Sequence, residues 1–552
     1  MQNQCDIALV MAGAVSAGAY TAGVVDFLIQ ALDQWQQARD NDDPTAPPHQ
    51  INLKLLTGAS AGGMTAAITT TILAGRPHQP IGNDDPGLDV SDNVLFQSWV
   101  NDIDIEPLLG LSDLQKNEPL LSLLDSSILD VIAEKALQTD RLAQRKPWAD
   151  DQLEVLLTLA NLRGVPYNIP FVTEDNSQPA AERPGHGMRQ HRDYLHFSFH
   201  PTAQAGTHAL DWQGQHAGWS LLRQAALATG AFPLGLAPRK IRQPGNFYDQ
   251  RSFRTEGPGK LDTGECLCVI EPRIAAAWGG PAPADYHFIS VDGGVFDNEP
   301  YELARSRLNA DQPETLTESK TTRFMLAIDP FPDTRNFAND DYTEPESMLD
   351  LLLRLIGAMK NQGRFKPAEL ATAANHISAS RRIIAPSRPG TSPGELQIAS
   401  GLLGGFSGFL ERGFRYHDFM LGRANCQEFL REHFSLPQDN PLIGQWTPAQ
   451  RQAHSSTNGL CPVIPLYGTA REAVAVPAWP RISPARLRLL QKLAKKRINK
   501  MLPELFKVVV PGNRVFRKLA VWVARLTQTG DWTKRGINTV TQQLQEHDLM
   551  AD

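Results

Sequence analysis

The chain has 552 residues, of which 41% are hydrophobic and 20% are charged, a composition typical of a soluble globular protein with a large core. A formal net charge of −7 at pH 7 argues against a protein that binds nucleic acid over its whole surface. Five cysteines are few and odd in number, which excludes a disulfide framework and fits a reducing compartment. The length favours one enlarged domain and an appended region.

The first sixty residues alternate between short apolar runs and helical patterns. Ile7–Val10 suits a buried strand, and Gly18–Gln36 carries apolar residues at helical spacing. A polar, Pro-rich loop at 41–50 precedes a second strand at Leu53–Thr57 and a helix at Ala61–Leu73. This strand–turn–helix alternation predicts an α/β fold with a mainly parallel sheet.

The apolar segment 7–19 could pass for the hydrophobic core of a signal peptide. However, Asp6 lies at its entrance and the first basic residue is Arg39, whereas a secretory signal begins with a positive leader. No uninterrupted run of about 18 apolar residues occurs. We therefore expect a cytoplasmic protein with neither a signal peptide nor a membrane-spanning helix.

Further elements follow along the chain. The expected strands are Ile169–Val172, Leu195–Phe199, His287–Val291 and Phe324–Ile328. The expected insertions, which are polar or rich in Pro and Gly, are 76–92, 174–192 and 243–264. After about residue 335 the pattern becomes mainly helical, with expected helices at Glu346–Arg364, Arg412–Phe434 and Pro484–Leu502 and a flexible stretch at 386–395.

The second strand leads into a G-x-S-x-G sequence at residues 58–62. At such a nucleophile elbow the strand turns into a helix so tightly that Gly58 and Gly62 are needed on either side of Ser60, and Gly63 follows. The turn exposes the Ser60 hydroxyl at the edge of the sheet. The alternative is a Gly-rich turn that binds phosphate or allows close packing. A Walker A loop is excluded, because no Gly-Lys-Ser/Thr follows.

Asp292 directly follows an expected strand and precedes Gly293 and Gly294. Two glycines let the backbone turn sharply and leave the carboxylate unobstructed, so that it could accept the serine proton. The alternative is an aspartate that caps a turn, since Asp-Gly is a common turn pair.

A serine–histidine–aspartate triad would need a histidine late in the chain. The four candidates are His417, His433, His454 and His547. None of them follows a clear strand, so we expect all four at the surface and a serine–aspartate pair instead.

Four blocks in this order resemble the patatin-like phospholipase family. They are Gly18–Val24, Gly58–Gly63, Ala228–Pro233, and Asp292–Gly294 with Asn298 and Pro300 behind it. The resemblance covers about residues 5 to 335. It implies a three-layer α/β/α core and a Ser60–Asp292 dyad that cleaves lipid esters through an acyl-enzyme, without metal or cofactor. It also implies a catalytic domain at 1–335 and a helical C-terminal region at 336–552.

The loop after the first strand departs from the family's pattern. The family shows about three glycines followed by a basic residue, whereas this chain has Gly13-Ala14-Val15-Ser16-Ala17-Gly18. Backbone N–H groups of Gly13 and Ala14, joined by Ala61, could still form an oxyanion hole. The missing cation leaves three alternatives open. These are a phospholipase, an esterase or thioesterase for other acyl groups, and a silent scaffold that acts as an interaction module.

A basic region lies near the C-terminus. Eight Lys and Arg residues occur between Arg481 and Lys500 with no acidic residue among them, and basic residues continue to Arg525. The segment 481–526 could lie on an anionic membrane as an amphipathic helix, or it could pack on the main domain with a solvated basic face. Pro503 and Pro511 favour the packed arrangement.

No metal site is expected. Cys266 and Cys268 are separated by one residue, and no second Cys or His pair lies at zinc-ligand spacing.

Overall fold

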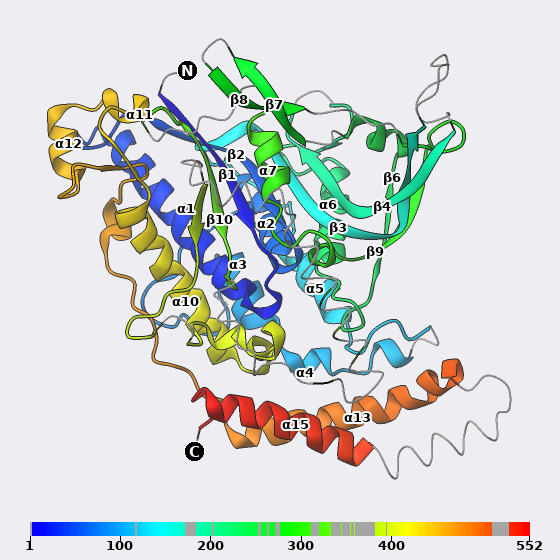
Figure 1. The fold of residues 1–552 in the computed structure, drawn as a ribbon. Coiled ribbons are helices and arrows are strands. Elements are labelled where there is room, and N and C mark those ends of the chain that lie inside the picture. Colours follow the sequence, from blue (N-terminus) through cyan, green and yellow to red (C-terminus); the bar gives the residue numbers. More distant parts are fainter. Residues whose placement is uncertain are drawn as a thin grey trace.

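The structure is a computed structural model that describes residues 3–115, 119–171, 184–200, 204–251, 255–261, 264–270, 276–310, 319–332, 381–392, 395–509 and 529–551, with single residues at 344, 351, 354 and 358. Helices cover both faces of a mainly parallel central sheet, which is the three-layer α/β/α architecture that the sequence predicted (Figure 1).

Among the described residues the central sheet has nine strands in the order β11-β10-β1-β2-β3-β4-β5, with β9 paired to β3 and β6 paired to β9. Their bounds are Gln4–Met11 (β1), Gln50–Gly58 (β2), Ala149–Pro170 (β3), Gly185–Ser198 (β4), His208–Ala209 (β5), Arg239–Gln243 (β6), Tyr286–Asp292 (β9), Arg323–Ile328 (β10) and Arg381–Ile384 (β11). The pairs from β11 to β3 are parallel, whereas β3 runs antiparallel to both β4 and β9. Two small antiparallel pairs lie outside this sheet, Thr255–Leu261 (β7) with Gly264–Ile270 (β8) and Ser435–Leu436 (β12) with Cys461–Pro462 (β13).

The longer helices are Gly18–Asp40 (α1), Ser60–Leu73 (α2), Ser127–Ala136 (α5), Gly218–Thr229 (α6), Tyr301–Leu308 (α7), Arg412–Glu428 (α10), Pro484–Val509 (α13) and Thr529–Glu546 (α15). The shorter helices are Val94–Phe96 (α3), Ile105–Leu108 (α4), Pro441–Gly444 (α11) and Pro448–His454 (α12). Helices α1, α2, α6 and α10 cover one face of the sheet and α7 covers the other.

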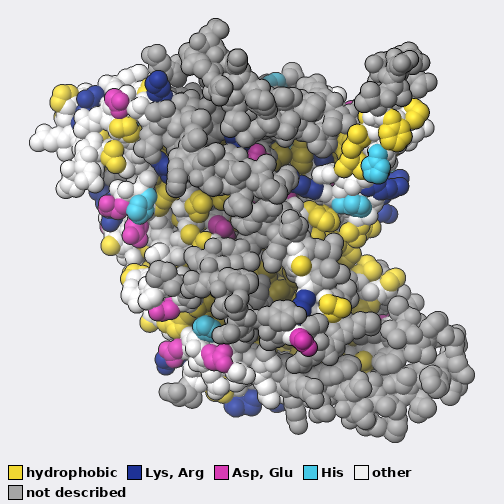
Figure 2. All heavy atoms as spheres, in the orientation of Figure 1, with side chains coloured by type: hydrophobic (Ala, Val, Ile, Leu, Met, Phe, Trp, Pro, Cys, Tyr) yellow, Lys and Arg dark blue, Asp and Glu magenta, His cyan; other side chains and the backbone are white. Residues whose placement is uncertain are grey.

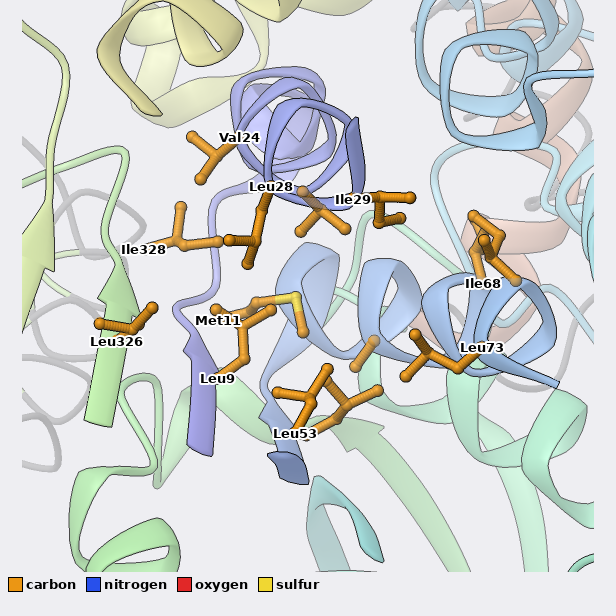
Figure 3. Packing of buried hydrophobic residues seen from close by; sticks show 14 of the residues in the cluster. Leu9, Met11, Val24, Leu28, Ile29, Leu53, Ile68, Leu73, Leu326 and Ile328 are labelled. Carbon is orange, nitrogen blue, oxygen red and sulfur yellow. The ribbon is translucent and has the colours of Figure 1, made fainter. Parts of the chain in front are cut away.

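Alternation along the central strands sorts their side chains between the two faces. Leu9 and Met11 of β1 point toward α1 and α2, and Figure 3 shows Leu28 of α1 next to Met11. Val10 lies between them in the chain and instead joins the cluster that packs against α7. This two-sided burial explains why the strands are almost wholly apolar, and it confirms the strand–helix alternation of the first seventy residues.

One expected strand was wrong. The prediction placed it at 169–172, whereas the strand begins at Ala149 and ends at Pro170. The apolar run within 153–160 is its buried centre, and the expected segment overlaps only its last two residues, Ile169 and Pro170. The expected loop at 174–192 also contains the first half of β4.

The C-terminal region joins the same sheet and core. Strand β11 pairs with β10, and α10 packs along α1 (Figure 1). The expected helices at Arg412–Phe434 and Pro484–Leu502 are confirmed by α10 and α13. The expected helix at Glu346–Arg364 lies almost wholly outside the described residues, and the described part of 386–395 has no helix or strand.

The segment Val15–Asp40 has the length and the apolar character of a membrane-spanning helix, with a mean hydropathy of 1.3 over its best window. In that window 94% is buried inside the protein. Packing of α1 between the sheet and α10 therefore accounts for its apolar sequence.

Candidate active site

Ser60 lies at the turn between β2 and α2, as the sequence predicted. It is the first residue of α2, with a φ of +50°, in the left-handed region that residues other than glycine rarely adopt. A Cβ on Gly58 would lie 2.6 Å from the backbone of Gly62, and a Cβ on Gly62 would lie 2.2 Å from the carbonyl oxygen of Met11. Both positions therefore require glycine, because the turn brings backbone against backbone.

Thr229 supports this strained turn from α6. Its Oγ1 accepts a hydrogen bond from the Ser60 N–H at 2.9 Å, and its side chain is fully buried. A Cβ on Gly63 would come within 2.7 Å of the same threonine, so the glycine allows α6 to approach. The sequence placed Thr229 in a block that shapes the site but gave it no role.

The long strand β3 brings Asp292 to Ser60. Its first half pairs with β2 up to Leu157 opposite Gly58, and the three residues 159–161 then pair with β9, with Leu159 opposite Asp292. Strands β2 and β9 thus end facing each other along one edge of β3. Side chains far apart in the sequence meet at that point.

The Ser60 hydroxyl donates a hydrogen bond to Oδ2 of Asp292 at 2.6 Å. The other oxygen, Oδ1, accepts from the Gly294 N–H at 2.8 Å, and only 6% of Ser60 and 4% of Asp292 is exposed. A Cβ on Gly293 would lie 2.2 Å from the carbonyl oxygen of Thr158. The two glycines therefore hold the carboxylate in place, and it faces the hydroxyl in this structure.

The expected oxyanion hole needs a correction. The Gly13 N–H donates to the carbonyl oxygen of Asn298 at 3.0 Å, so it is already occupied. The Asn298 side chain donates back to the Gly13 carbonyl oxygen at 3.3 Å, and Gly13 lies so close that a Cβ there would be 3.0 Å from that of Ser60. Within the described chain the N–H groups of Ala14 and Ala61 donate no hydrogen bond and stay available.

A segment of the C-terminal region covers the site. Residues 402–410 carry two phenylalanines, Phe406 and Phe409, that border the same cavity as Ser60. The hydroxyl of Ser16 donates to the Gly405 carbonyl oxygen and accepts from the Gly408 N–H at 3.0 Å. We call residues 402–410 the roof segment. No prediction covered this segment, although two phenylalanines and three glycines within nine residues mark it as unusual.

The cavity beside Ser60 and Asp292 is apolar and encloses about 470 Å³ of space, including its open mouth. Besides the pair, its lining residues come from six parts of the chain and include Val15, Met64, Trp99, Ile103, Leu108, Leu124, Leu129, Phe232, Leu236, Phe406 and Phe409. A second apolar cavity between α2, α5 and α6 shares Met64, Trp99, Ile103 and Leu129 with the first. These four side chains lie between the two cavities, which are therefore adjacent.

No histidine lines the cavity within the described part of the chain. The expectation of a surface position is wrong for His417, which is buried in α10 with Nδ1 at 2.9 Å from a carboxylate oxygen of Asp418. His454 is half-buried against Tyr467, whereas His433 and His547 are exposed. His417 can be buried because its ring is hydrogen-bonded to the Asp418 carboxylate and packs edge-on against Trp479.

No group of three or more His, Cys, Asp or Glu side chains is placed to hold a metal ion among the residues described. Cys5, Cys426 and Cys461 are buried free thiols. Burial raises the pKa of Cys426 to values outside the physiological range, which makes it an inert core thiol. The side chains of Cys266 and Cys268 lie outside the described residues.

Comparison with known proteins finds a relative in sequence and a distant likeness in structure. The uncharacterized protein y4iI of Sinorhizobium fredii is 35% identical over 546 residues, covering 89% of this chain and 75% of that protein. No family model matches. The crystal structure of VipD from Legionella pneumophila is 12% identical, with a TM-score of 0.22 over all of this chain and 89% of that chain, which is too distant to align individual residues. The chain therefore belongs to the same protein family as y4iI.

Proposed function

We propose that the protein is a serine acyl hydrolase of the patatin-like type that cleaves ester bonds of lipids with Ser60 and Asp292. The observation that carries this proposal is the 2.6 Å hydrogen bond from a strained, glycine-flanked serine to a buried carboxylate at the mouth of an apolar cavity. Strained backbone at a polar pair in a cavity is typical of functional sites.

In the first half-reaction Ser60 attacks the ester carbonyl carbon. Its proton passes to Asp292 as the new C–O bond forms, and the carbonyl electron pair moves onto the oxygen. The free N–H groups of Ala14 and Ala61 would bind that oxyanion, with the N-terminus of α2 adding its dipole. The carbonyl then re-forms, and the leaving alcohol takes the proton from Asp292.

In the second half-reaction water replaces the alcohol. Asp292 accepts a proton from water as the resulting hydroxide adds to the acyl carbon. The tetrahedral intermediate then collapses, and Ser60 leaves with the proton returned from Asp292. The products are a free fatty acid and the restored hydroxyl.

Two adjacent apolar cavities support an acyl chain as the substrate's buried part. The first offers aliphatic and aromatic carbon around Ser60, and an acyl path that continued into the second, between α2, α5 and α6, would hold further methylene groups there. Its described lining contains no Lys or Arg that could bind a phosphate. That observation favours a second candidate, an esterase or thioesterase that acts on neutral or lysolipid acyl groups.

The test is hydrolysis of p-nitrophenyl esters of increasing chain length. Ser60→Ala and Asp292→Asn should each lose about 10³-fold or more in kcat/KM. Ser290→Ala is the matched control, since this buried serine lies in the same strand as Asp292 and bonds only its neighbour's carbonyl oxygen. Equal activity in all four proteins would exclude the dyad, and a protein inactive on every ester would support a silent scaffold.

A cavity-filling variant tests the acyl path. Ala133 lines only the inner cavity, so Ala133→Trp should lower activity on long-chain esters and spare short ones. A uniform loss at all chain lengths would mean that the chain does not enter there. Phospholipid and neutral lipid mixtures would then identify the head group by the species that disappear.

A further inference from the structure

Three large leucines lie exposed at the rim of the Ser60 cavity. The exposed fractions are 60% for Leu121, 52% for Leu123 and 60% for Leu234. The backbones of the two rim loops pair directly, because the Leu123 N–H donates to the Leu234 carbonyl oxygen at 2.7 Å. Neighbouring residues of the same loops, Leu124 and Leu236, point into the cavity. The two rim loops thus place leucine side chains both in the cavity and at the surface of the protein.

Leu234 shows that this exposure is structurally costly. Its φ is +64°, a conformation that is unfavourable for a leucine and that glycine or asparagine would adopt more easily. Its side chain nevertheless points to solvent rather than into the core. Neither packing nor backbone preference accounts for a leucine here, whereas contact with an apolar phase would.

The basic helix α13 is fixed to the same rim. Arg497 is buried, with Nη2 at 2.7 Å from a carboxylate oxygen of Asp113, and it also donates to the carbonyl oxygens of Gly110 and Leu123. In Figure 1 the helix runs beneath α4, along the lower side of the molecule. This position agrees with the packed arrangement that Pro503 and Pro511 favour. Arg497 thereby joins α13 to the backbone of the exposed Leu123.

The opposite face of α13 presents cations to solvent. Arg488, Lys492, Lys495, Lys496 and Lys500 are exposed, and in the described chain none of them forms an ion pair. The residues that pack inward, such as Leu490 and Met501, lie on the other side of the helix. Lys496 directly precedes Arg497 and Lys500 follows it by three residues, so both lie on the part of α13 that Arg497 fixes to the rim loops. In Figure 2 the acidic side chains lie mainly over the α1 and α10 side, away from the right-hand edge over α5 and β9, where hydrophobic side chains reach the surface.

We infer that the rim leucines and the exposed cations of α13 form one docking surface for an anionic lipid bilayer. The leucines would enter the acyl region beside the cavity mouth, and the lysines would bind lipid phosphates around them. A lipid drawn from the bilayer would then reach Ser60 without crossing water. This inference rests on the proposed function for its purpose, but its test does not need catalysis.

The test is co-sedimentation of the full chain, in a Ser60→Ala background, with vesicles. The protein with an unchanged surface should bind vesicles of equal parts phosphatidylcholine and phosphatidylglycerol much more tightly than vesicles of pure phosphatidylcholine. Added salt should weaken the binding to the anionic vesicles. Lys492→Gln, Lys496→Gln and Lys500→Gln should each lower binding about fivefold, and together about a hundredfold. The same three positions changed to arginine should keep it.

The leucines are tested separately. Leu121→Ser, Leu123→Ser and Leu234→Asn combined should reduce binding at least about tenfold, whereas Leu88→Ser, the most exposed leucine outside the rim, should not. Hydrolysis of a soluble short-chain ester by the same variants with Ser60 restored should be unchanged, which separates failed docking from failed catalysis. Equal vesicle binding by wild type and both triple variants would overturn the inference. A lack of binding to anionic vesicles would also overturn it, and is the outcome expected if the surface binds a protein or a second copy of this chain.

Discussion

Two loops border Ser60, and they are held in opposite ways. The turn after β2 is fixed by its own sequence, because Gly58 and Gly62 are the residues that permit backbone to touch backbone there. The loop after β1 is fixed from a distance, by Asn298 on one side and by the roof segment on the other. The turn that carries the proposed nucleophile is thus encoded locally, whereas the loop that would bind the oxyanion depends on the whole fold.

The largest effect should come from breaking the local turn. Gly62→Ala would place a Cβ 2.2 Å from the Met11 carbonyl oxygen, which only a shift of backbone can relieve. We expect a loss of about 3 kcal/mol in the free energy of unfolding and no measurable hydrolysis. Urea denaturation measures the first. Gly444→Ala is the control, since a Cβ there meets nothing within 4 Å.

A smaller effect should follow when the distant support of the other loop is removed. Asn298→Ala deletes the hydrogen bond to the Gly13 carbonyl oxygen, which should misplace Ala14 and lower kcat about 10²-fold. KM should change little, because the acyl cavity is untouched. Asn298→Asp lacks the same donor and should behave alike. A wild-type kcat in both variants would show that this side chain does not position the loop.

Thr229 tests the third support, from α6 to the elbow. Thr229→Val leaves the buried Ser60 N–H without an acceptor, at a cost of about 1–3 kcal/mol in stability and roughly tenfold in kcat. Thr229→Ser keeps the hydroxyl and should retain most of both. If valine and serine behave identically, the hydrogen bond contributes nothing measurable.

The smallest effect at neutral pH concerns the docking of the C-terminal region. His49 stacks on Trp446, lies tilted against Trp35 and is hydrogen-bonded to the Val463 carbonyl oxygen, and burial lowers its pKa from 6.5 to about 4. The unfolded chain takes up this proton below pH 6.5 but the folded chain does not. Stability should therefore be unaffected above pH 6.5 and should fall by about 3 kcal/mol as the pH drops to 4.

The check is chemical denaturation at several pH values, compared with His49→Gln. Glutamine can donate to the same carbonyl oxygen but does not titrate, so its stability should fall less steeply between pH 6.5 and 4. Parallel curves for the two proteins would assign the acid sensitivity to other groups.

The elements that are encoded over a few residues were predictable. The tight turns at Ser60 and Asp292 were predicted from the sequence, because such turns leave a local signature of glycine. Their proximity could not be predicted from the local sequence, because it depends on the pairing of β3 with both β2 and β9, which brings the ends of β2 and β9 together.

Long-range features escaped the sequence. The occupied Gly13 N–H depends on Asn298, and the burial of His417 depends on how α10 packs against the rest of the chain. The exposed leucines of the rim were equally hidden, because a leucine gives no sign of its exposure until the backbone that holds it is known. Tertiary contacts determine these hydrogen bonds and exposures, so the composition and periodicity of the sequence do not predict them.

The most direct measurement is labelling of the purified protein with a fluorophosphonate, followed by mass spectrometry of the peptides. Only an activated serine reacts with this probe, so the adduct should form stoichiometrically on the peptide that contains residue 60. It should disappear in Asp292→Asn, whose stability should match that of wild type. An unlabelled protein, or an adduct on any other serine, would contradict the assignment of Ser60 and Asp292 as a nucleophile and its base.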